Sequence, residues 1–223
     1  MQDVVQVLGR LRRFARFGRS DVSEVDTAFV ALRALLAEVD APYKLVGGLA
    51  VIHHGYERLT VDIDLLVGRE ALEAIKARAP EHGFTILSQR RLLHEPTGVR
   101  VDLLVAGEPI PRSTDVTFPS PESMGASPHD ATFIGLSGLF ELKLRSGRNK
   151  DLADITELLK SIDDTRYIFL ESEVPRELRR EFADLRRDAL EELAWAEQDA
   201  KREREADASH DAPSNSDRDD HGN

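Results

Sequence analysis

Cysteine is absent from this chain of 223 residues, which excludes disulfides, zinc–thiolate sites and thiol catalysis. Long apolar runs are absent too, so the sequence predicts neither a membrane-spanning helix nor a secretory signal. We therefore expect no membrane partner and a cytoplasmic location. The hydrophobic content of 41% is nevertheless compatible with a globular core.

Positive charge is scarce, because the formal net charge is −11. Such an excess of acid argues at first against a nucleic-acid partner. The charge is unevenly spread, however. Residues 1–20 hold five arginines against one aspartate, whereas 206–223 hold five aspartates against one arginine. The net charge therefore says little about the charge around an active site.

Hydrophobic periodicity and composition divide the chain into four regions. We expect N-terminal helices in residues 1–40, a core of alternating strands and helices in 41–165, and a charged helical segment in 166–205. The acidic tail, 206–223, is expected to be disordered because it lacks large apolar side chains. The alternation in the core predicts an α/β (α+β) fold with a mixed central sheet flanked by helices.

The core shows strand-like and helix-like patterns in turn. Apolar runs with few polar interruptions are typical of buried strands, and apolar residues at helical spacing indicate helices. On this basis we expect strands at 43–46, 61–67, 84–88 and 99–105, and helices at 49–54, 71–79, 136–146 and 151–161. A turn-rich connection with many prolines separates the last strand from the last two helices.

Two aspartates, Asp62 and Asp64, interrupt the apolar run 61–67. Side chains two residues apart on a strand project to the same face, so these carboxylates converge. Two like charges in an apolar strand are costly unless something neutralises them. A magnesium ion does so through oxygen ligands, and needs only one or two carboxylates plus substrate phosphates. The alternative, common for an isolated Asp-x-Asp, is a solvent-facing pair at a strand end.

Two neighbouring patterns favour the metal-binding interpretation. Gly47 and Gly48 stand between a predicted strand and helix, where glycine permits close backbone approach and helix N–H groups can meet phosphate. A bare Gly-Gly is otherwise best explained as a tight turn. One aspartate, Asp102, interrupts the apolar run 99–105, and a third carboxylate on a neighbouring strand could complete a metal site. Taken singly, Asp102 is equally well explained as a strand-end surface residue.

The order of these motifs resembles the nucleotidyltransferase superfamily related to DNA polymerase beta. Its pattern is an apolar residue, Gly-Gly, a gap and then Asp-x-Asp between apolar residues. Here the gap between the glycines and the aspartates is 49–61. Small bacterial nucleotidyltransferases of the AbiEii and MenT types are more closely similar, through Val-Gly-Gly-x-Ala at 46–50 and Arg-x-Thr-x-Asp-Ile-Asp at 58–64. A later stretch, 139–155, is also similar, so the resemblance covers roughly residues 40–160.

The resemblance implies a role for each matching residue. Asp62, Asp64 and Asp102 would hold catalytic Mg²⁺, and Asp102 would also help to activate the attacking hydroxyl. The residues implied to bind the nucleoside triphosphate are Gly47, Gly48, Arg58, Thr60 and Lys143. The extra helices at both ends would be additions to a nucleotidyltransferase fold.

Other polar residues near these motifs have simpler explanations. Lys150, Asp151 and Asp154 match a recurring motif of less settled role, and we expect the two aspartates to cap and anchor a helix. His53 and His54 follow the glycines without a carboxylate at metal-ligand spacing nearby. We therefore expect both histidines to be packing or surface residues.

The implied reaction transfers a nucleoside monophosphate from a nucleoside triphosphate such as ATP to an acceptor hydroxyl and releases pyrophosphate. The acceptor would be tRNA, as in a toxin–antitoxin enzyme paired with an antitoxin protein, or alternatively a small-molecule antibiotic or a protein. Arginines at 12, 13, 16 and 19 could attract RNA phosphates, although a solvated helix face explains them better. A non-catalytic partner-binding protein on the same fold is the alternative from another class, and the presence of all three carboxylates argues against it.

Overall fold

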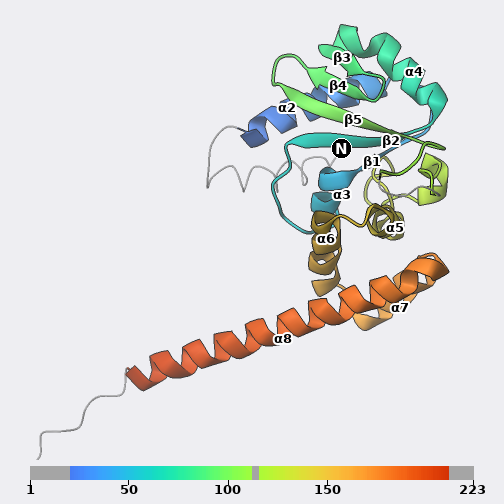
Figure 1. Ribbon diagram of the computed structural model, residues 1–223. Helices are drawn as coiled ribbons and strands as arrows, with labels where there is room; N and C mark the ends of the chain where they lie inside the picture. Colours follow the sequence, from blue (N-terminus) through green and yellow to red (C-terminus); the bar gives the residue numbers. More distant parts are fainter. Residues whose placement is uncertain (1–20, 112–115, 211–223) are drawn as a thin grey trace, which may run out of the picture.

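The computed structural model describes residues 21–111 and 116–210 of the chain. Its strands are β1 (Tyr43–Val46), β2 (Asp62–Val67), β3 (Phe84–Ser88), β4 (Arg91–His94) and β5 (Val99–Val105). They form one sheet in the order β1-β2-β5-β4-β3 (Figure 1). The β2–β5 pair is parallel, and the other neighbouring pairs are antiparallel. The predicted mixed sheet is therefore confirmed.

Helices cover both faces of this sheet, as predicted (Figure 1). One face carries α2 (Asp21–Leu36) and α4 (Arg69–Arg78), and the other carries α3 (Gly47–His53) and α5 (Leu136–Ser146), with α6 (Asn149–Lys160) packed against α5. Short 3₁₀ helices lie at η1 (Ala79–His82), η2 (Pro121–Met124) and η3 (Arg176–Leu178). The chain ends in α7 (Asp164–Glu173) and the long α8 (Arg179–His210).

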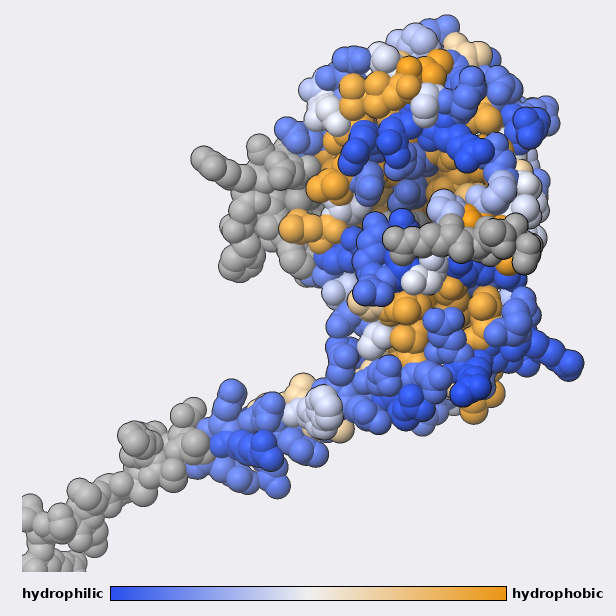
Figure 2. Space-filling view, viewed as in Figure 1, coloured by the Kyte–Doolittle hydropathy of each residue, from blue (hydrophilic) through white to orange (hydrophobic). Residues whose placement is uncertain are grey.

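The inner part of α8 packs on α6, whereas its outer part extends away from the body (Figure 1). The described outer surface of α8 is mainly hydrophilic, in contrast to the apolar patches on the body (Figure 2). Among the described helices, none is both long enough and apolar enough to cross a membrane.

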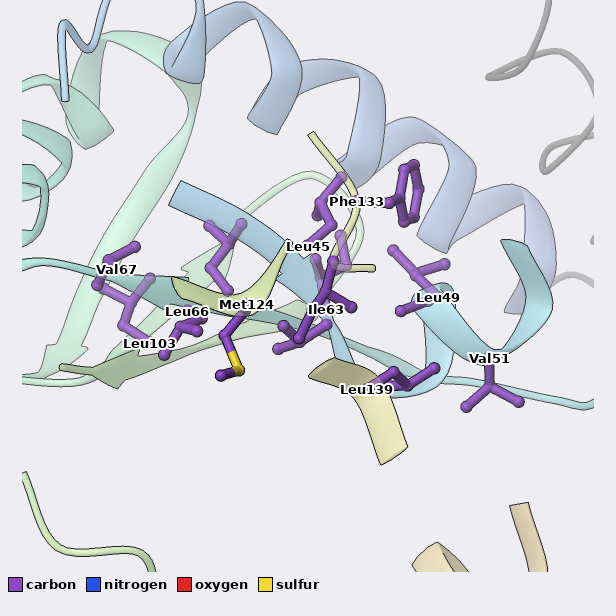
Figure 3. Close-up of a cluster of buried hydrophobic side chains, with 14 of the residues drawn as sticks. Leu45, Leu49, Val51, Ile63, Leu66, Val67, Leu103, Met124, Phe133 and Leu139 are labelled. Carbon is purple, nitrogen blue, oxygen red and sulfur yellow. The ribbon is translucent and has the colours of Figure 1, made fainter. Parts of the chain in front are cut away.

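The core fixes the strands relative to the helices that surround the site. Figure 3 shows part of this buried cluster in close-up. It includes side chains from β1, α3, β2, β5 and α5, each at most 2% exposed: Leu45, Leu49, Ile63, Leu103 and Leu139. Burying a side chain of this size contributes roughly 1.5–3 kcal/mol. The apolar positions of β2 and β5 therefore hold the polar positions between them at a defined place.

The structure matches the expected bounds of β1, β3, β5 and α5, and it corrects others. α3 begins at Gly47 rather than at 49, so both glycines belong to the helix. β4, which was not expected, has only four residues and is held by β3 and β5 on either side. α8 continues to His210, beyond the predicted end at 205. The arginine-rich residues 1–20 and the tail 211–223 lie outside the described residues.

Candidate active site

Three aspartates meet on one face of the sheet. Asp64 in β2 lies opposite Asp102 in β5 in the parallel register, so the two side chains project side by side. Asp62 is two residues before Asp64 on the same strand and shares its face. The structure therefore brings together the three carboxylates that the sequence singled out.

The pKa of Asp64 is shifted well above its ordinary value. Burial is the main cause that raises the pKa of Asp64 from 3.8 to about 6, and the charges of Asp62 and Asp102 raise it further. The positive charges of Lys150 and Arg148 act in the opposite direction. Within the described part of the chain, no hydrogen bond reaches the Asp64 carboxylate. An ionised Asp64 is therefore poorly neutralised, which is the condition that a bound cation would relieve.

The Gly-Gly pair packs directly against the aspartate strand. Gly47 has a φ of +60°, in the left-handed region that favours glycine. A Cβ on Gly47 would overlap Oδ2 of Asp64, and a Cβ on Gly48 would overlap Oγ1 of Thr60. Thr60 is itself buried, and its hydroxyl donates to the backbone carbonyl of Asp62 at 3.2 Å. The two motifs therefore interlock, and each glycine is required by a side chain of the other motif.

A second acidic cluster, the Lys143 cluster, lies next to the three aspartates. Lys143 of α5 is buried, and its Nζ lies 2.9 Å from Oδ1 of Asp151 and 2.6 Å from Oδ2 of Asp154. Nε of Arg58 lies 2.8 Å from Oδ1 of Asp154. Asp151 also accepts a hydrogen bond from Oγ of Ser146 at 2.7 Å. These contacts tie α6 both to α5 and to the segment that leads into β2.

The Lys143 cluster corrects the expected capping role of Asp151 and Asp154 and shows the partners of Lys143. Asp151 and Asp154 do anchor α6, but neither caps it, because the N-cap is Arg148 and no side-chain hydrogen bond is made there. Lys143, expected beside the triphosphate, has its charge balanced by two buried carboxylates. Lys150, at the exposed start of α6, is therefore better placed to present a positive charge to a ligand.

Arg91 is a site residue that sequence reasoning missed. It lies opposite Asp102 in the antiparallel β4–β5 pair, and its Nε donates to Oδ1 of Asp102 at 2.5 Å. The guanidinium thus holds one oxygen of the third carboxylate. No local sequence pattern identifies this partner, because the contact depends on the cross-strand register of β4 and β5.

The two histidines after the glycines are packing residues, as expected. His53 stacks on Phe133 with ring centroids 4.1 Å apart, and its Nε2 lies 2.7 Å from Oγ of Ser127. Nε2 of His54 lies 2.9 Å from the carbonyl oxygen of Ile134. Burial is the main cause that lowers the pKa of His54 to about 4. Both rings therefore pack α3 against the segment that holds Ser127, Phe133 and Ile134.

Two adjoining cavities open beside Asp64. The polar cavity, of about 150 Å³, is lined by residues that include Gly48, Arg58, Thr60, Asp62 and Lys150. The apolar cavity, of about 120 Å³, is lined by residues that include Leu104, Ile110, Phe118, Leu139 and Leu142. Five residues line both cavities: Gly47, Asp64, Lys143, Arg148 and Asp151. The cavities therefore meet at Asp64, and Asp102 lines neither of them.

The carboxylate oxygens of the site suit a magnesium ion that also binds a phosphate. Among the described residues, no three Asp, Glu or His side chains form a group that could hold a metal ion by themselves. Magnesium does not need such a cage, because one or two carboxylates with phosphate oxygens and water complete its coordination. Asp62 and Asp64 supply hard oxygen donors on one face. These residues therefore fit a magnesium ion that is held jointly with a phosphate ligand.

Comparison with known proteins does not assign a family or a function to this site. No protein-family model matches the sequence, and a search of curated proteins finds no match. The interpretation of the site therefore rests on the residues and on the chemistry that their arrangement permits.

Proposed function

We propose that this protein is a magnesium-dependent nucleotidyltransferase. It would move a nucleoside monophosphate from a nucleoside triphosphate to an acceptor hydroxyl and release pyrophosphate. The observation that most directly supports this proposal is the meeting of Asp62, Asp64 and Asp102 on one face of the sheet. Gly47, from a motif distant in sequence, packs against the central aspartate. The elements of the resemblance therefore converge at one place.

The carboxylates would divide the work between metal and acceptor. Asp62 and Asp64 would hold the magnesium ion. When bound, that ion would neutralise charge on the phosphate oxygens and align the acceptor for in-line attack on the α-phosphorus. Asp102 would orient or deprotonate the acceptor hydroxyl. Arg91 holds Oδ1 of Asp102, which leaves the second carboxylate oxygen for that role.

The phosphates would lie in the polar cavity. Gly47 and Gly48 line it without side chains, so a phosphate can approach the backbone closely. Lys150 and Arg148 supply positive charge at its wall, where phosphate charge would need to be balanced. Arg58 lines the same cavity, but its guanidinium also holds Asp154. Positioning and electrostatics account for the proposed catalysis, without a covalent intermediate.

The acceptor is proposed at the level of class. The resemblance implies tRNA, with an antitoxin protein as a second partner, or else an antibiotic or a protein. Each of these acceptors offers a hydroxyl for the same attack on the α-phosphorus. The described geometry is common to all of them, so the acceptor has to be identified by experiment.

The test incubates the purified full chain with magnesium and each α-labelled nucleoside triphosphate. Total tRNA, the protein itself and an aminoglycoside panel serve as acceptors. We expect label transfer to one of these acceptors, and we expect the transfer to disappear in the double variant Asp62→Asn/Asp64→Asn. The matched control is Asp184→Asn/Asp188→Asn, which makes the same charge change on exposed positions of α8 and should retain transfer.

Two results would overturn the proposal. One is the absence of transfer together with the absence of magnesium-dependent nucleotide binding by calorimetry, which would leave a partner-binding protein. The other is transfer that survives in the double aspartate variant, which would place the chemistry elsewhere on the chain.

A further inference from the structure

The apolar cavity has walls from three parts of the chain. Leu104 follows Asp102 by two residues on β5, so both side chains occupy the face of the sheet that carries the site. Leu139 and Leu142 come from α5 and cover this face. The third wall comes from the connection after β5. This cavity therefore continues the carboxylate face toward the carboxyl end of the sheet strands.

Backbone hydrogen bonds hold the third wall in place. The N–H of Ile110 donates to the carbonyl of Val116 at 2.9 Å, and the N–H of Phe118 donates to the carbonyl of Glu108 at 2.8 Å. Ile110 and Phe118 are 2% and 9% exposed, so both side chains are turned inward. These contacts give the wall a defined position, as the walls of a binding site require.

A packing defect is a poor explanation for this cavity. The cavity measures about 120 Å³ and is partly open, so it is a cleft rather than one of the small voids that imperfect packing leaves in an interior. Apolar cavities do not hold ordered water well, and they bind apolar ligands instead. The cavity also opens onto Asp64, at the centre of the proposed active site. An apolar group of a ligand is therefore its natural occupant.

Continuity with the polar cavity identifies which ligand this is. The five shared residues make the two cavities adjoin, with Asp64 and Gly47 among the residues at the junction. A molecule that spans both would join a polyanion to an apolar group. The acceptor does not fit this description, because Asp102, which would contact its hydroxyl, lines neither cavity. The acceptor would approach from the side of Asp102 and Arg91.

We propose that the apolar cavity binds the base of the same nucleoside triphosphate whose phosphates lie in the polar cavity. This inference rests on the proposed function. Leu104, Leu142 and Phe118 contact the base by shape and apolar packing, because their side chains offer no hydrogen-bonding groups. Apolar pockets discriminate weakly between ligands of equal size, by about 10–200-fold. These apolar walls therefore distinguish nucleotides by the size of the base more than by its exocyclic groups.

The test compares two titrants by calorimetry with the full chain in magnesium: each nucleoside triphosphate, and inorganic tripolyphosphate, which has no base. Leu104→Phe and Leu142→Phe fill the cavity from a strand and from a helix. We expect both variants to weaken nucleotide binding at least about tenfold, because the larger side chain takes up volume that the base would occupy. Both variants should leave tripolyphosphate binding unchanged. The control is Leu87→Phe, on an exposed position of β3. Thermal unfolding verifies that each variant is folded.

The outcomes separate this inference from the proposed function. Unchanged nucleotide binding in both folded variants overturns the inference and leaves the proposed function intact. A raised KM for the acceptor with unchanged nucleotide binding also overturns it, because the cavity would then hold the acceptor. If the unmodified chain binds neither titrant, the proposed function fails and the inference fails with it.

Discussion

Two groups of aspartates lie next to each other in this molecule, and they are in opposite electrostatic states. In the Lys143 cluster, burial raises the pKa of Asp151, but hydrogen bonds and charges from Arg148, Lys143 and Ser146 outweigh burial and hold that pKa below its usual value. At Asp64, burial and like charges act together, and the pKa rises to about 6.

The difference lies in the donors that the fold supplies. The Lys143 cluster has a cation or hydroxyl for each of its carboxylates, so it is complete without a ligand and joins α6 to α5. In the three-aspartate site Arg91 pairs with Asp102, but no hydrogen-bond donor among the described residues reaches Asp64, and its charge calls for a cation from outside. Burial of an acid therefore does not by itself indicate function; burial without compensating donors does.

The largest expected effect comes from breaking the completed cluster. Lys143→Met removes the cation between Asp151 and Asp154 and leaves buried charge without its partner. We expect a loss of about 3–5 kcal/mol in the free energy of unfolding, measured by urea denaturation at pH 7. Lys201→Met, at an exposed position of α8, is the control and should change this value by less than about 1 kcal/mol. Equal effects of the two variants would refute an anchoring role.

Gly47→Ala should have the next largest effect, because it breaks the contact between the glycine motif and the three-aspartate site. The left-handed φ alone costs about 1–2 kcal/mol for a residue with a Cβ, and the new methyl would overlap Asp64. We expect lower stability and loss of magnesium-dependent nucleotide binding. Gly68→Ala is the matched control, since a Cβ there meets nothing within 4 Å and φ is −76°. Normal nucleotide binding by Gly47→Ala would contradict the proposed close approach.

Asp64→Asn should stabilise the metal-free protein, opposite in sign to Lys143→Met. Between pH 3.8 and about 6, Asp64 is ionised in the unfolded state but still largely protonated in the folded state. The stability of the wild type therefore falls relative to that of the variant as the pH rises through this window. We expect an advantage for the variant of about 3 kcal/mol at pH 8 that shrinks toward pH 4, measured by urea denaturation in a chelator. Asp184→Asn is the exposed control. A variant less stable than wild type at pH 8 would show that Asp64 is already neutralised.

The smallest effect on stability is expected at Arg91. Its side chain is 46% exposed, so Arg91→Gln should change the free energy of unfolding by less than about 1 kcal/mol. Because it orients Asp102, the variant should lower kcat several-fold while magnesium-dependent nucleotide binding stays unchanged. Arg90→Gln, which removes the neighbouring ion pair with Glu108, is the control. Weakened nucleotide binding by Arg91→Gln would instead place this guanidinium among the phosphates.

Much of the local structure was predictable from short-range patterns. The apolar runs of β1, β3 and β5 and the helical spacing of α5 mark their own bounds. The period of two along a strand was sufficient to place Asp62 and Asp64 on one face. β4 escaped prediction because its two leucines are flanked by Arg91 and His94 and form no apolar run.

The sequence by itself therefore determined the strand and helix pattern of the core and the pairing of Asp62 with Asp64, because both depend on neighbouring residues. Only the tertiary structure decided that Asp102 lies opposite Asp64, that Arg91 holds Asp102, and that Lys143 is occupied by two aspartates. Those contacts join segments far apart in the chain. Their register is set by the packing of the whole core, which no local pattern records.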